Sequence, residues 1–475
     1  SNSTWGAEGV VSGIYDKLSL SAGYTHFKTD GWRTNADQKD DIANVFAQLE
    51  LTYKTSIQAE YRYRDNDRGD IELRSFEDDF LPNLRKKDET NTVRLGFRHG
   101  FSPSSVLIGN FQYSDADRRV EDSKEPVLKL FEIKGDDEAY GGELQYLFRS
   151  QYINIVGGAG HFEIDSKDKI TREFAPPGPT IKTTVDRDTT ASNAYLYSYI
   201  KLLENLTLTL GGSGDFVDTD DDLLKDKDQF NPKFGLTWNP LQDTTLRAAA
   251  FRVLKRTLIT DQTLEPTQVA GFNQFFDEIN VTDYWLYGGA IDQKFSENIY
   301  GGAEYTYRDL NVPFTTTDQT PELVNVDWEE KLFRAYLFWT PRNWLALSAE
   351  YRYEDLDRDK DYNRNVKSAK TNYVPLGVNF FHPSGLSASF KGTYINQDGR
   401  FNRQDAPPGV NINGQDNFWL FDAAISYRFP KRYGFLTVGV RNLTDEDFEY
   451  FDTDPDNPRV QPDRFFFVSV TLALP

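Results

Sequence analysis

Apolar and polar residues alternate with a period of two along most of this chain, and this alternation constrains the fold more than any other feature. In "SIQAEYRYRD", which begins at Ser56, the side chains of Ile57, Ala59, Tyr61 and Tyr63 fall on one face of a β-strand. Polar and charged side chains take the other face. The same rule recurs in "LALSAEYRYED", "LTLTLGGSGDF", "LSASFKGTYIN", "LSLSAGYTHF" and "FLTVGVRN". The sequence therefore predicts about 21 strands, each roughly ten residues long.

The composition favours a membrane protein whose spans are strands. No run of eighteen or more apolar residues occurs, so there is no candidate transmembrane helix. Aromatic residues make up 15% of the chain, yet charged residues reach 27% and the mean hydropathy is -0.62, which is unusual for a soluble core. Alternating apolar and charged faces suit a β-barrel with lipid outside and a polar lumen inside. A soluble propeller or a stack of sandwiches is the alternative.

Tyrosines end the apolar stripe in three similar phrases, "EYRYRD", "EYTYRD" and "EYRYED", and aspartates follow each time. Aromatic rings at the ends of the apolar band form the interfacial girdle of a membrane barrel, with the charged loop beyond it. The predicted girdle residues are Tyr61, Tyr63, Tyr305, Tyr307, Tyr351 and Tyr353.

Short connectors alternate with long acidic ones along the chain. "SPSS", "NPLQD", "PRN" and "HPSG" take turns with "RDNDRGDIELRSFEDDFLPNLRKKDE", "SDADRRVEDSKEPVLKLFEIKGDDE", "DSKDKITREFAPPGPTIKTTVDRD" and "DTDDDLLKDKDQ". Outer-membrane barrels have short periplasmic turns and long extracellular loops. We therefore predict an all-β fold: a transmembrane antiparallel barrel in a bacterial outer membrane, where it contacts lipid and lipopolysaccharide.

The phase of the strands predicts the size of the barrel. The first recognisable strand, about residues 5–15, ends at a short turn and so runs towards the periplasm. A closed barrel with an even number of strands needs one strand before it, which gives about 22 strands with the first at or before residue 1. No linker or composition break divides residues 1–475, so we expect one barrel domain, with any plug or periplasmic domain upstream.

Several classes of function are disfavoured. The chain has no cysteine and four histidines, which excludes disulfides and thiolate metal sites. The net charge of -21 argues against nucleic acid as a partner, because phosphate binding needs clustered lysine and arginine. No nucleophile elbow, paired histidine and serine box or metal motif is present. We therefore predict a protein that is not an enzyme and has no catalytic residue or cofactor.

The charged face of the repeated phrases supplies candidates for selectivity. Charged side chains that line a pore bias which solutes pass, but they can equally pair across strands and only hold the barrel. Both interpretations stay open for Glu60, Arg62, Arg64, Glu304, Arg308, Glu350 and Arg352.

Aspartate-rich loops are weaker candidates for calcium, which prefers clustered oxygen ligands. The best group is Asp218, Asp220 and Asp222, although its spacing does not match an EF-hand and solvated loop charge is the alternative.

The segment from Leu258 to Asp283 differs from the other long connectors. It carries less charge and holds three phenylalanines, which predicts a constriction folded into the lumen or a surface for a partner or ligand. A loop packed on its neighbours is the alternative. The residues concerned are Phe272, Phe275 and Phe276.

The C-terminal stretch "GVRNLTDEDFEYFDTDPDNPRVQPDRFFFVSVTLAL" resembles the end of TonB-dependent outer-membrane receptors. In that family the penultimate strand ends in an Asn-Leu-Thr-Asp type box, and an arginine precedes the final strand. The matching residues are Asn442, Leu443, Thr444, Asp445, Glu446, Tyr450 and Arg464. The resemblance implies an outer-membrane barrel of about 22 strands.

A second stretch, "NPKFGLTWNPLQDTTLRAAAFRVLKRTLITDQTLEPTQVAGFNQFFDE", looks like the barrel part of large bacterial proteins that join periplasmic tetratricopeptide repeats to such a barrel. That resemblance implies surface display or export.

Three functions are open on these grounds. The barrel is a channel or translocation pore for solutes or an exported polymer, a surface anchor for a partner protein, filament or periplasmic repeat domain, or a TonB-dependent uptake receptor. A pore predicts conductance by the isolated barrel. An anchor predicts a periplasmic or lumen-filling protein partner that copurifies with it.

Overall fold

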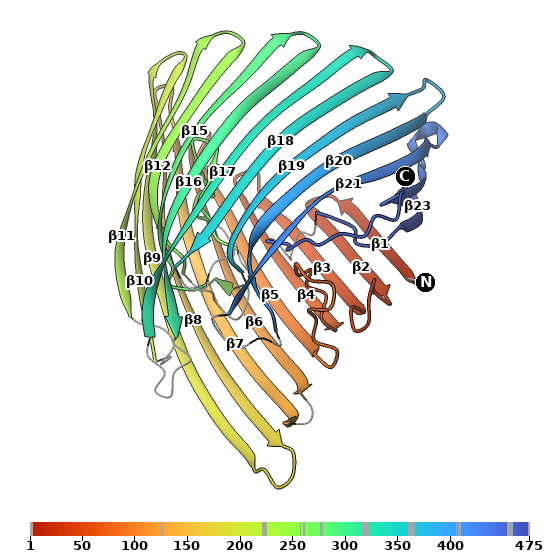
Figure 1. Cartoon of the computed structure of the whole chain (residues 1–475). Helices are drawn as coiled ribbons and strands as arrows, with labels where there is room; N and C mark the ends of the chain where they lie inside the picture. Colours follow the sequence, from red (N-terminus) through yellow and green to blue (C-terminus); the bar gives the residue numbers. More distant parts are fainter. Residues whose placement is uncertain are drawn as a thin grey trace.

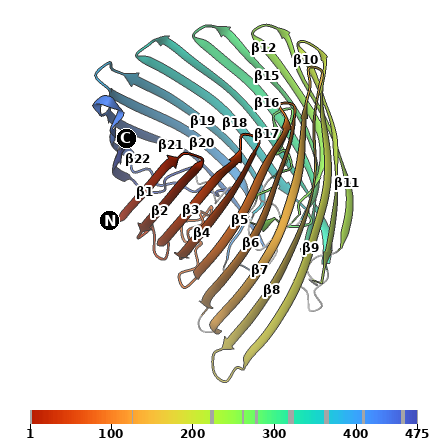
Figure 2. The ribbon, with the colours of Figure 1, turned by 180° about the vertical axis from the view of Figure 1, so that it is seen from behind.

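The computed structural model is an antiparallel β-barrel wall of 21 strands that surrounds a wide interior (Figures 1 and 2). It describes residues 3–124, 127–220, 226–256, 258–259, 262–275, 279–315, 323–359, 366–404, 406, 410–453 and 459–473. No helix within these ranges has the length and hydropathy to cross a membrane. The predicted all-β fold and the predicted number of strands in this chain are confirmed.

The first half of the wall comprises β1 (Thr4–Tyr15), β2 (Leu18–Thr29), β3 (Gln38–Thr52), β4 (Thr55–Arg68), β5 (Arg85–Ser102), β6 (Ser105–Lys124), β7 (Leu128–Arg149), β8 (Ile153–Phe174), β9 (Thr180–Leu203), β10 (Leu206–Thr219), β11 (Lys227–Leu241) and β12 (Thr244–Leu254). The second half comprises β15 (Asp283–Ser296), β16 (Ile299–Thr315), β17 (Leu323–Arg342), β18 (Leu345–Arg358), β19 (Val366–Phe381), β20 (Leu386–Asn402), β21 (Asn411–Arg428), β22 (Gly434–Arg441) and β23 (Phe465–Leu472). A two-stranded hairpin, β13 (Gln268–Val269) and β14 (Phe272–Asn273), and the 3-10 turn η2 (Pro430–Arg432) complete the elements.

Each wall strand pairs antiparallel with the strands before and after it in the chain. The hairpin β13–β14 stands apart from this ladder, so β12 pairs directly with β15 across the connection between them. At the ends of the described chain, β1 pairs with β2 and β23 pairs with β22. A 22nd strand stays a prediction.

The connections at one end of the barrel (upper end in Figure 1) are all short, with at most five residues, whereas those at the other end are mostly longer; the exceptions there are β6–β7 and β8–β9. The first connection at the upper end holds Asp16 in a left-handed conformation, with φ of 50°. We call this the short-turn end and the opposite one the long-loop end.

Two of the predicted loops are wrong: residues 114–138 and 165–188 are mostly strand. They extend β6 to β9 to as many as 24 residues, beyond the neighbouring strands at the long-loop end (Figure 1). Their charged side chains pair within and between strands, so the sheet continues without an apolar stripe. The pairs include Arg119–Glu132, Lys129–Glu173 and Arg187–Asp168.

The two faces of the wall differ as the alternation predicts. On β9 to β11 the exposed outer side chains include Leu196, Phe216 and Phe230. Alternate residues, such as Tyr197 and Asp215, are buried on the inner face. The barrel therefore presents apolar side chains outward and keeps its polar groups inside.

The predicted girdle tyrosines lie on the outer face. Tyr61, Tyr305 and Tyr351 are exposed, and the hydroxyls of Tyr61 and Tyr351 donate hydrogen bonds to Asn91 and Asn372 on the neighbouring strands. The interfacial role of the six tyrosines stays a prediction.

Candidate functional site

The connection between β12 and β15 folds back against the inner wall. Its residues Val269 and Phe272 belong to one buried apolar cluster with inward side chains of the wall, among them Tyr197, Phe251 and Leu286. This cluster draws on strands from β9 to β17. We call residues 255–282 the lumen segment; the structure describes 255–256, 258–259, 262–275 and 279–282 of it.

A tight turn presses the lumen segment onto the wall. Ala270 and Gly271, between β13 and β14, both have positive φ, of 48° and 87°. A Cβ atom on Gly271 would lie 2.5 Å from an Nη atom of Arg247, so glycine is needed for both conformation and space. The turn places Phe272 under the Arg247 guanidinium, 5.2 Å from its ring centroid.

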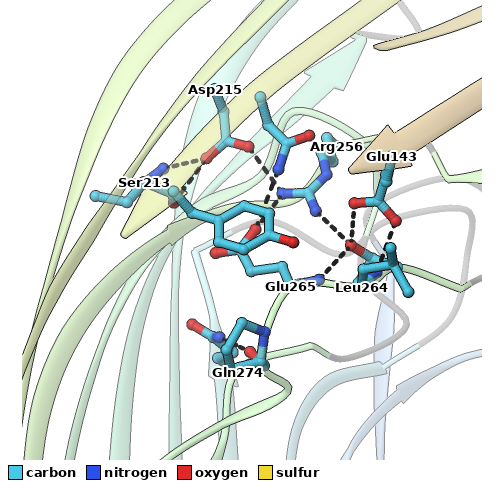
Figure 3. Close-up of polar contacts among 12 residues, drawn as sticks. Glu143, Ser213, Asp215, Arg256, Leu264, Glu265 and Gln274 are labelled. Carbon is cyan, nitrogen blue, oxygen red and sulfur yellow. Dashed lines mark hydrogen bonds and ion pairs between the residues drawn. The ribbon is translucent and has the colours of Figure 1, made fainter. Parts of the chain in front are cut away.

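Arg256 is the centre of a buried charge network (Figure 3). Its Nη1 lies 2.9 Å from Oδ1 of Asp215 on β10 and 2.9 Å from Oε2 of Glu265 within the lumen segment. Its Nη2 donates to the hydroxyl of Thr263 at 3.0 Å. Only 3% of Arg256, 1% of Asp215 and 2% of Glu265 are exposed, so this guanidinium and both carboxylates depend on one another for solvation.

Wall residues complete the solvation of the two carboxylates. Oδ2 of Asp215 accepts hydrogen bonds from Asn231 at 2.6 Å and Ser213 at 3.2 Å. Oε1 of Glu265 accepts from the hydroxyl of Tyr197 at 2.6 Å. Asp215 on β10 thus holds the lumen segment by charge, Tyr197 on β9 holds it by a hydrogen bond, and Asn231 on β11 supports Asp215.

Strand β7 binds the same segment from the other side. Oε1 of Glu143 accepts from the hydroxyl of Thr263 at 2.7 Å, and Oε2 accepts from the backbone N–H of Leu264 at 2.6 Å. The amide of Gln145 donates to the Leu264 carbonyl and, at 3.1 Å, to the hydroxyl of Tyr195. These contacts span more than a hundred residues of sequence, so they fix the segment across the interior.

The hairpin end of the segment is held by Gln274, which is fully buried. Its amide donates to the hydroxyl of Tyr197 at 2.9 Å and to the Pro266 carbonyl, and its backbone carbonyl accepts from the hydroxyl of Tyr284. Nearby, Nζ of the buried Lys233 donates to the carbonyl of Arg252 at 2.6 Å. Gln274 therefore adds a polar contact between the wall and the segment, and Lys233 adds one to β12 close to where the segment begins.

The electrostatics favour the ionised forms of Arg256 and Glu265. Burial raises the pKa of Glu265, but Arg256 and Lys233 outweigh it, so the net effect is a pKa below the usual range. Burial also opposes the charge on Arg256, yet Glu265 and Asp215 raise its pKa above the ordinary arginine value. An ion pair of this kind holds the segment firmly as long as both partners are present.

Sequence reasoning identified this segment but not the residues that anchor it. Phe272 is 2% exposed and packs in the wall cluster, so it does not lie on a free surface. Phe275 lies 5.7 Å from the Arg256 guanidinium, and Phe276 falls outside the described residues. Arg256 and Glu265 were missed, although charged residues are sparse in this segment.

Six of the seven predicted lumen residues make ion pairs in the structure. The pairs are Glu60–Arg94, Arg64–Asp40, Glu304–Arg247, Arg308–Glu330, Glu350–Arg334 and Arg352–Glu350. The seventh, Arg62, lies on the same face of β4, between Glu60 and Arg64. The structure therefore shows ion pairs for these six, and whether the set determines selectivity or only holds the barrel stays open.

The connection between β22 and β23 also packs on the inner wall, and the Asn-Leu-Thr-Asp box shapes it. Asn442, 1% exposed and with φ of 46°, donates its amide protons to the carbonyls of Glu446, Gln461 and Pro462, and accepts from the N–H of Glu446. Arg464 pairs with Asp445 at 3.0 Å. The residues that carry the resemblance at this end of the chain therefore hold the β22–β23 connection together.

Aromatic side chains fix that connection onto the wall. Phe448 stacks on Phe418 of β21 with centroids 4.2 Å apart, and Tyr450 meets Phe418 edge-on at 6.3 Å. Tyr450 and Val460 share a buried cluster with Ile395 of β20. We call the described part of this connection, residues 442–453 and 459–464, the roof.

The structure describes two of the three calcium candidates. Asp218 is exposed, Asp220 accepts the backbone N–H of Asp188 at 2.5 Å, and Asp222 lies outside the described residues. No group of three or more histidine, aspartate or glutamate side chains placed to hold a metal occurs in the described ranges. Calcium binding stays a prediction.

Comparisons with known proteins agree on the architecture. The family model described as "TonB dependent receptor-like, beta-barrel" matches residues 2–318. Among solved structures, the ferric citrate transporter FecA in its unliganded form has a TM-score of 0.74 at 13% identity, over 99% of this chain and 76% of that one. The copper transporter OprC has a TM-score of 0.74 at 14% identity, over 99% and 79%.

The pyoverdine outer membrane receptor FpvA from Pseudomonas aeruginosa PAO1, bound to pyoverdine, has a TM-score of 0.74 at 11% identity, over 99% of this chain and 77% of that one. No curated protein matches the sequence. At these identities the structures show a shared fold. The predicted link to tetratricopeptide repeats stays a prediction.

Proposed function

We propose that this chain, which belongs to the family of TonB-dependent receptor-like β-barrels of the bacterial outer membrane, forms the passage through which a solute is taken up across that membrane. This proposal joins two of the three functions that the sequence leaves open, the pore and the uptake receptor. It takes its direction from the structural neighbours, which include a ferric citrate transporter, a copper transporter and a pyoverdine receptor.

The observation that carries the proposal is the locked lumen segment. A barrel of more than twenty strands is too wide for its own side chains to fill, so something else sets the width of the passage. Here a part of the chain between two wall strands is held inside by Arg256, Asp215 and Glu265. The segment covers the inner wall over β7 to β17, and the route for a solute runs along the opposite wall.

Reconstitution in planar bilayers tests the proposal. We expect the full chain to conduct ions, and the Arg256→Met variant, whose lumen segment is loosened, to admit larger polyethylene glycols than the wild type does. Arg94→Met removes an inward-facing arginine that pairs with Glu60, away from the segment, and should leave the polymer cut-off unchanged. No ion flux through wild type or variants would refute the passage and favour the anchor hypothesis.

A further inference from the structure

A cavity of about 340 Å³ lies in the inner wall of the other half of the barrel, near the short-turn end. Its lining comes from β17 to β23. The charged and polar side chains that line it are Glu350, Asn379, Lys391, Asp422 and Arg441. We propose that this cavity, which we call the wall pocket, binds a small carboxylate-bearing solute through Lys391 and Arg441.

The sheet register brings the two cations to either side of one aspartate. Lys391 on β20 pairs in register with Asp422 on β21. Arg441 ends β22, one residue beyond the register pair of Ala423 and Val440. The three side chains therefore form a short row across neighbouring strands on the inner face.

Both cations are free to bind an anion. Among the described residues, neither Lys391 nor Arg441 forms an ion pair, and each lies 5.9 Å from an aromatic ring, that of Tyr373 and of Phe467 respectively. Asp422 already accepts the backbone N–H of Asn442 through Oδ1, at 3.0 Å. The wall pocket thus differs from sites such as Arg94–Glu60 and Arg308–Glu330 on the inner wall, where the arginine is paired with a carboxylate.

The local charge is positive although the chain as a whole is acidic. Glu350 is the other carboxylate in the lining, and it is neutralised by Arg334 at 3.0 Å and Arg352 at 3.1 Å. The group around the wall pocket therefore holds more cations than carboxylates, in a protein whose net charge is -21. An anionic ligand would complete this arrangement.

The roof closes the wall pocket towards the long-loop end. Along β19 to β21, the inward residues that follow the pocket in that direction are Tyr373, Ile395 and Leu420, and they form a buried cluster with Tyr450 of the roof. The wall pocket is therefore reached from the lumen on its short-turn side. A partly enclosed site of low water content strengthens the attraction between its cations and an anion.

The rest of the lining points to a carboxylate on a small carbon skeleton. Pro375, Ala424 and Phe467 line the wall pocket on the same face as the cations and suit an apolar body. The two oxygens of a carboxylate match the planar fork of a guanidinium. The volume is near the lower end of the range for small-molecule sites, roughly 300–1,000 Å³. Inorganic phosphate has no carbon skeleton and would leave the apolar part uncovered.

The inference adds a class of solute to the proposed function. Only the role of the wall pocket in uptake rests on that function; the binding of a carboxylate does not. Binding can be measured without transport, so the proposed wall pocket and the proposed passage can be refuted independently. Titration calorimetry of the full chain in detergent, with citrate as the probe, should show binding that weakens as salt is added. A barrel that binds citrate but does not conduct would refute the passage alone.

Variants assign the binding to the wall pocket. Lys391→Gln and Arg441→Gln should each weaken citrate binding about tenfold, as for the loss of one charge-assisted hydrogen bond. The double variant should not bind. Asp422→Asn keeps the oxygen that accepts the Asn442 N–H but removes a competing charge, so it should bind citrate more tightly. Lys201→Gln, the same change on β9 outside the lining, should behave as the wild type.

Several outcomes would overturn the proposal. These are a wild type that does not bind citrate at millimolar concentration, a double variant that binds as well as the wild type, and weaker binding by Asp422→Asn. Binding of inorganic phosphate in preference to citrate would exclude the carboxylate class. We expect Asp422→Asn to bind citrate more tightly, and a misfolded variant cannot produce tighter binding. This variant therefore tests the proposal even if the other variants fold poorly.

Discussion

Replacement of Arg256 by methionine tests whether buried charge holds the lumen segment in place. The methionine side chain retains most of the length and apolar contact of the arginine stem but removes the guanidinium. Asp215 and Glu265 would then share a buried site without the cation that lies 2.9 Å from each. We expect the lumen segment to detach into the lumen while the wall strands stay paired, because the β12–β15 ladder does not run through the segment.

The size of the effect follows from the burial of the three groups. Removing one partner of a buried ion pair costs about 3–5 kcal/mol, because the remaining charge keeps its desolvation penalty. With about 1.4 kcal/mol for each factor of ten, the equilibrium for opening of the segment should shift by roughly a hundredfold to several thousandfold. Lys233 stays close to the network, so we expect a value towards the lower limit.

Hydrogen–deuterium exchange measures this shift directly. The N–H of Leu264 donates to Glu143 and the N–H of Gln274 donates to the Thr267 carbonyl, so both amides exchange slowly while the segment is docked. In Arg256→Met the protection of these two amides against exchange should fall by roughly a hundredfold to several thousandfold. Arg94→Met, whose inward-facing arginine pairs with Glu60, is the matched control and should leave it unchanged.

Two results would refute the reasoning. If peptides 262–275 exchange equally slowly in the wild type and in Arg256→Met, the buried charges do not hold the segment. If the wall strands lose protection together with the segment, the network stabilises the barrel as a whole and the segment is not a separable unit.

Three further predictions concern the lumen segment, the roof and the last strand pair. The pKa of Glu265 is lower in the folded chain than in the unfolded one, so its ion pair stabilises the segment fully above the unfolded pKa and is lost as pH falls through the folded pKa. Protection of the segment against hydrogen–deuterium exchange should therefore persist below about pH 4.3, the ordinary pKa of glutamate. Exchange measured as a function of pH tests this. Asn442→Ala leaves three partly buried carbonyls without the donor they share, so the roof should be cleaved more readily in limited proteolysis while the wall stays intact. Gly434→Ala should lower the thermal unfolding temperature, because φ is 144° and the new Cβ would lie 1.8 Å from the Thr471 carbonyl oxygen; Gly289→Ala, where nothing lies within 4 Å, should not.

The wall could be predicted from sequence because its main determinant is local. Alternation over a dozen residues decides which side chains meet lipid, and short connectors mark the short-turn end without any knowledge of distant contacts. The extensions of β6 to β9 were missed for the same reason. Their inner and outer faces are both polar, so the alternation disappears although pairs such as Arg119–Glu132 keep the strands together.

The site was only partly predictable, because its determinants are far apart in the chain. A lower charge and three phenylalanines set the lumen segment apart, but its partners come from β7, β9, β10 and β11. In a chain with 74 acidic residues, nothing in the sequence distinguishes Asp215 from a solvated loop aspartate. Its burial depends on the folding of the lumen segment, which brings Arg256 to within 2.9 Å of it.

An engineered disulfide between the lumen segment and the wall tests the central claim most directly. A Cβ atom on Gly235 of β11 would lie 3.0 Å from Cβ of Ala270 and 2.9 Å from Cγ1 of Val269. A disulfide spans about 3.5–4.5 Å between Cβ atoms, so the turn must move outward by about half an ångström to form one. The chain has no cysteine to interfere. We predict that the Gly235→Cys, Ala270→Cys double variant forms the disulfide on mild oxidation, detected by mass, whereas Gly96→Cys with Ala270→Cys does not. No disulfide in the first variant, or equal yields in both, would contradict a segment that is held against this part of the inner wall.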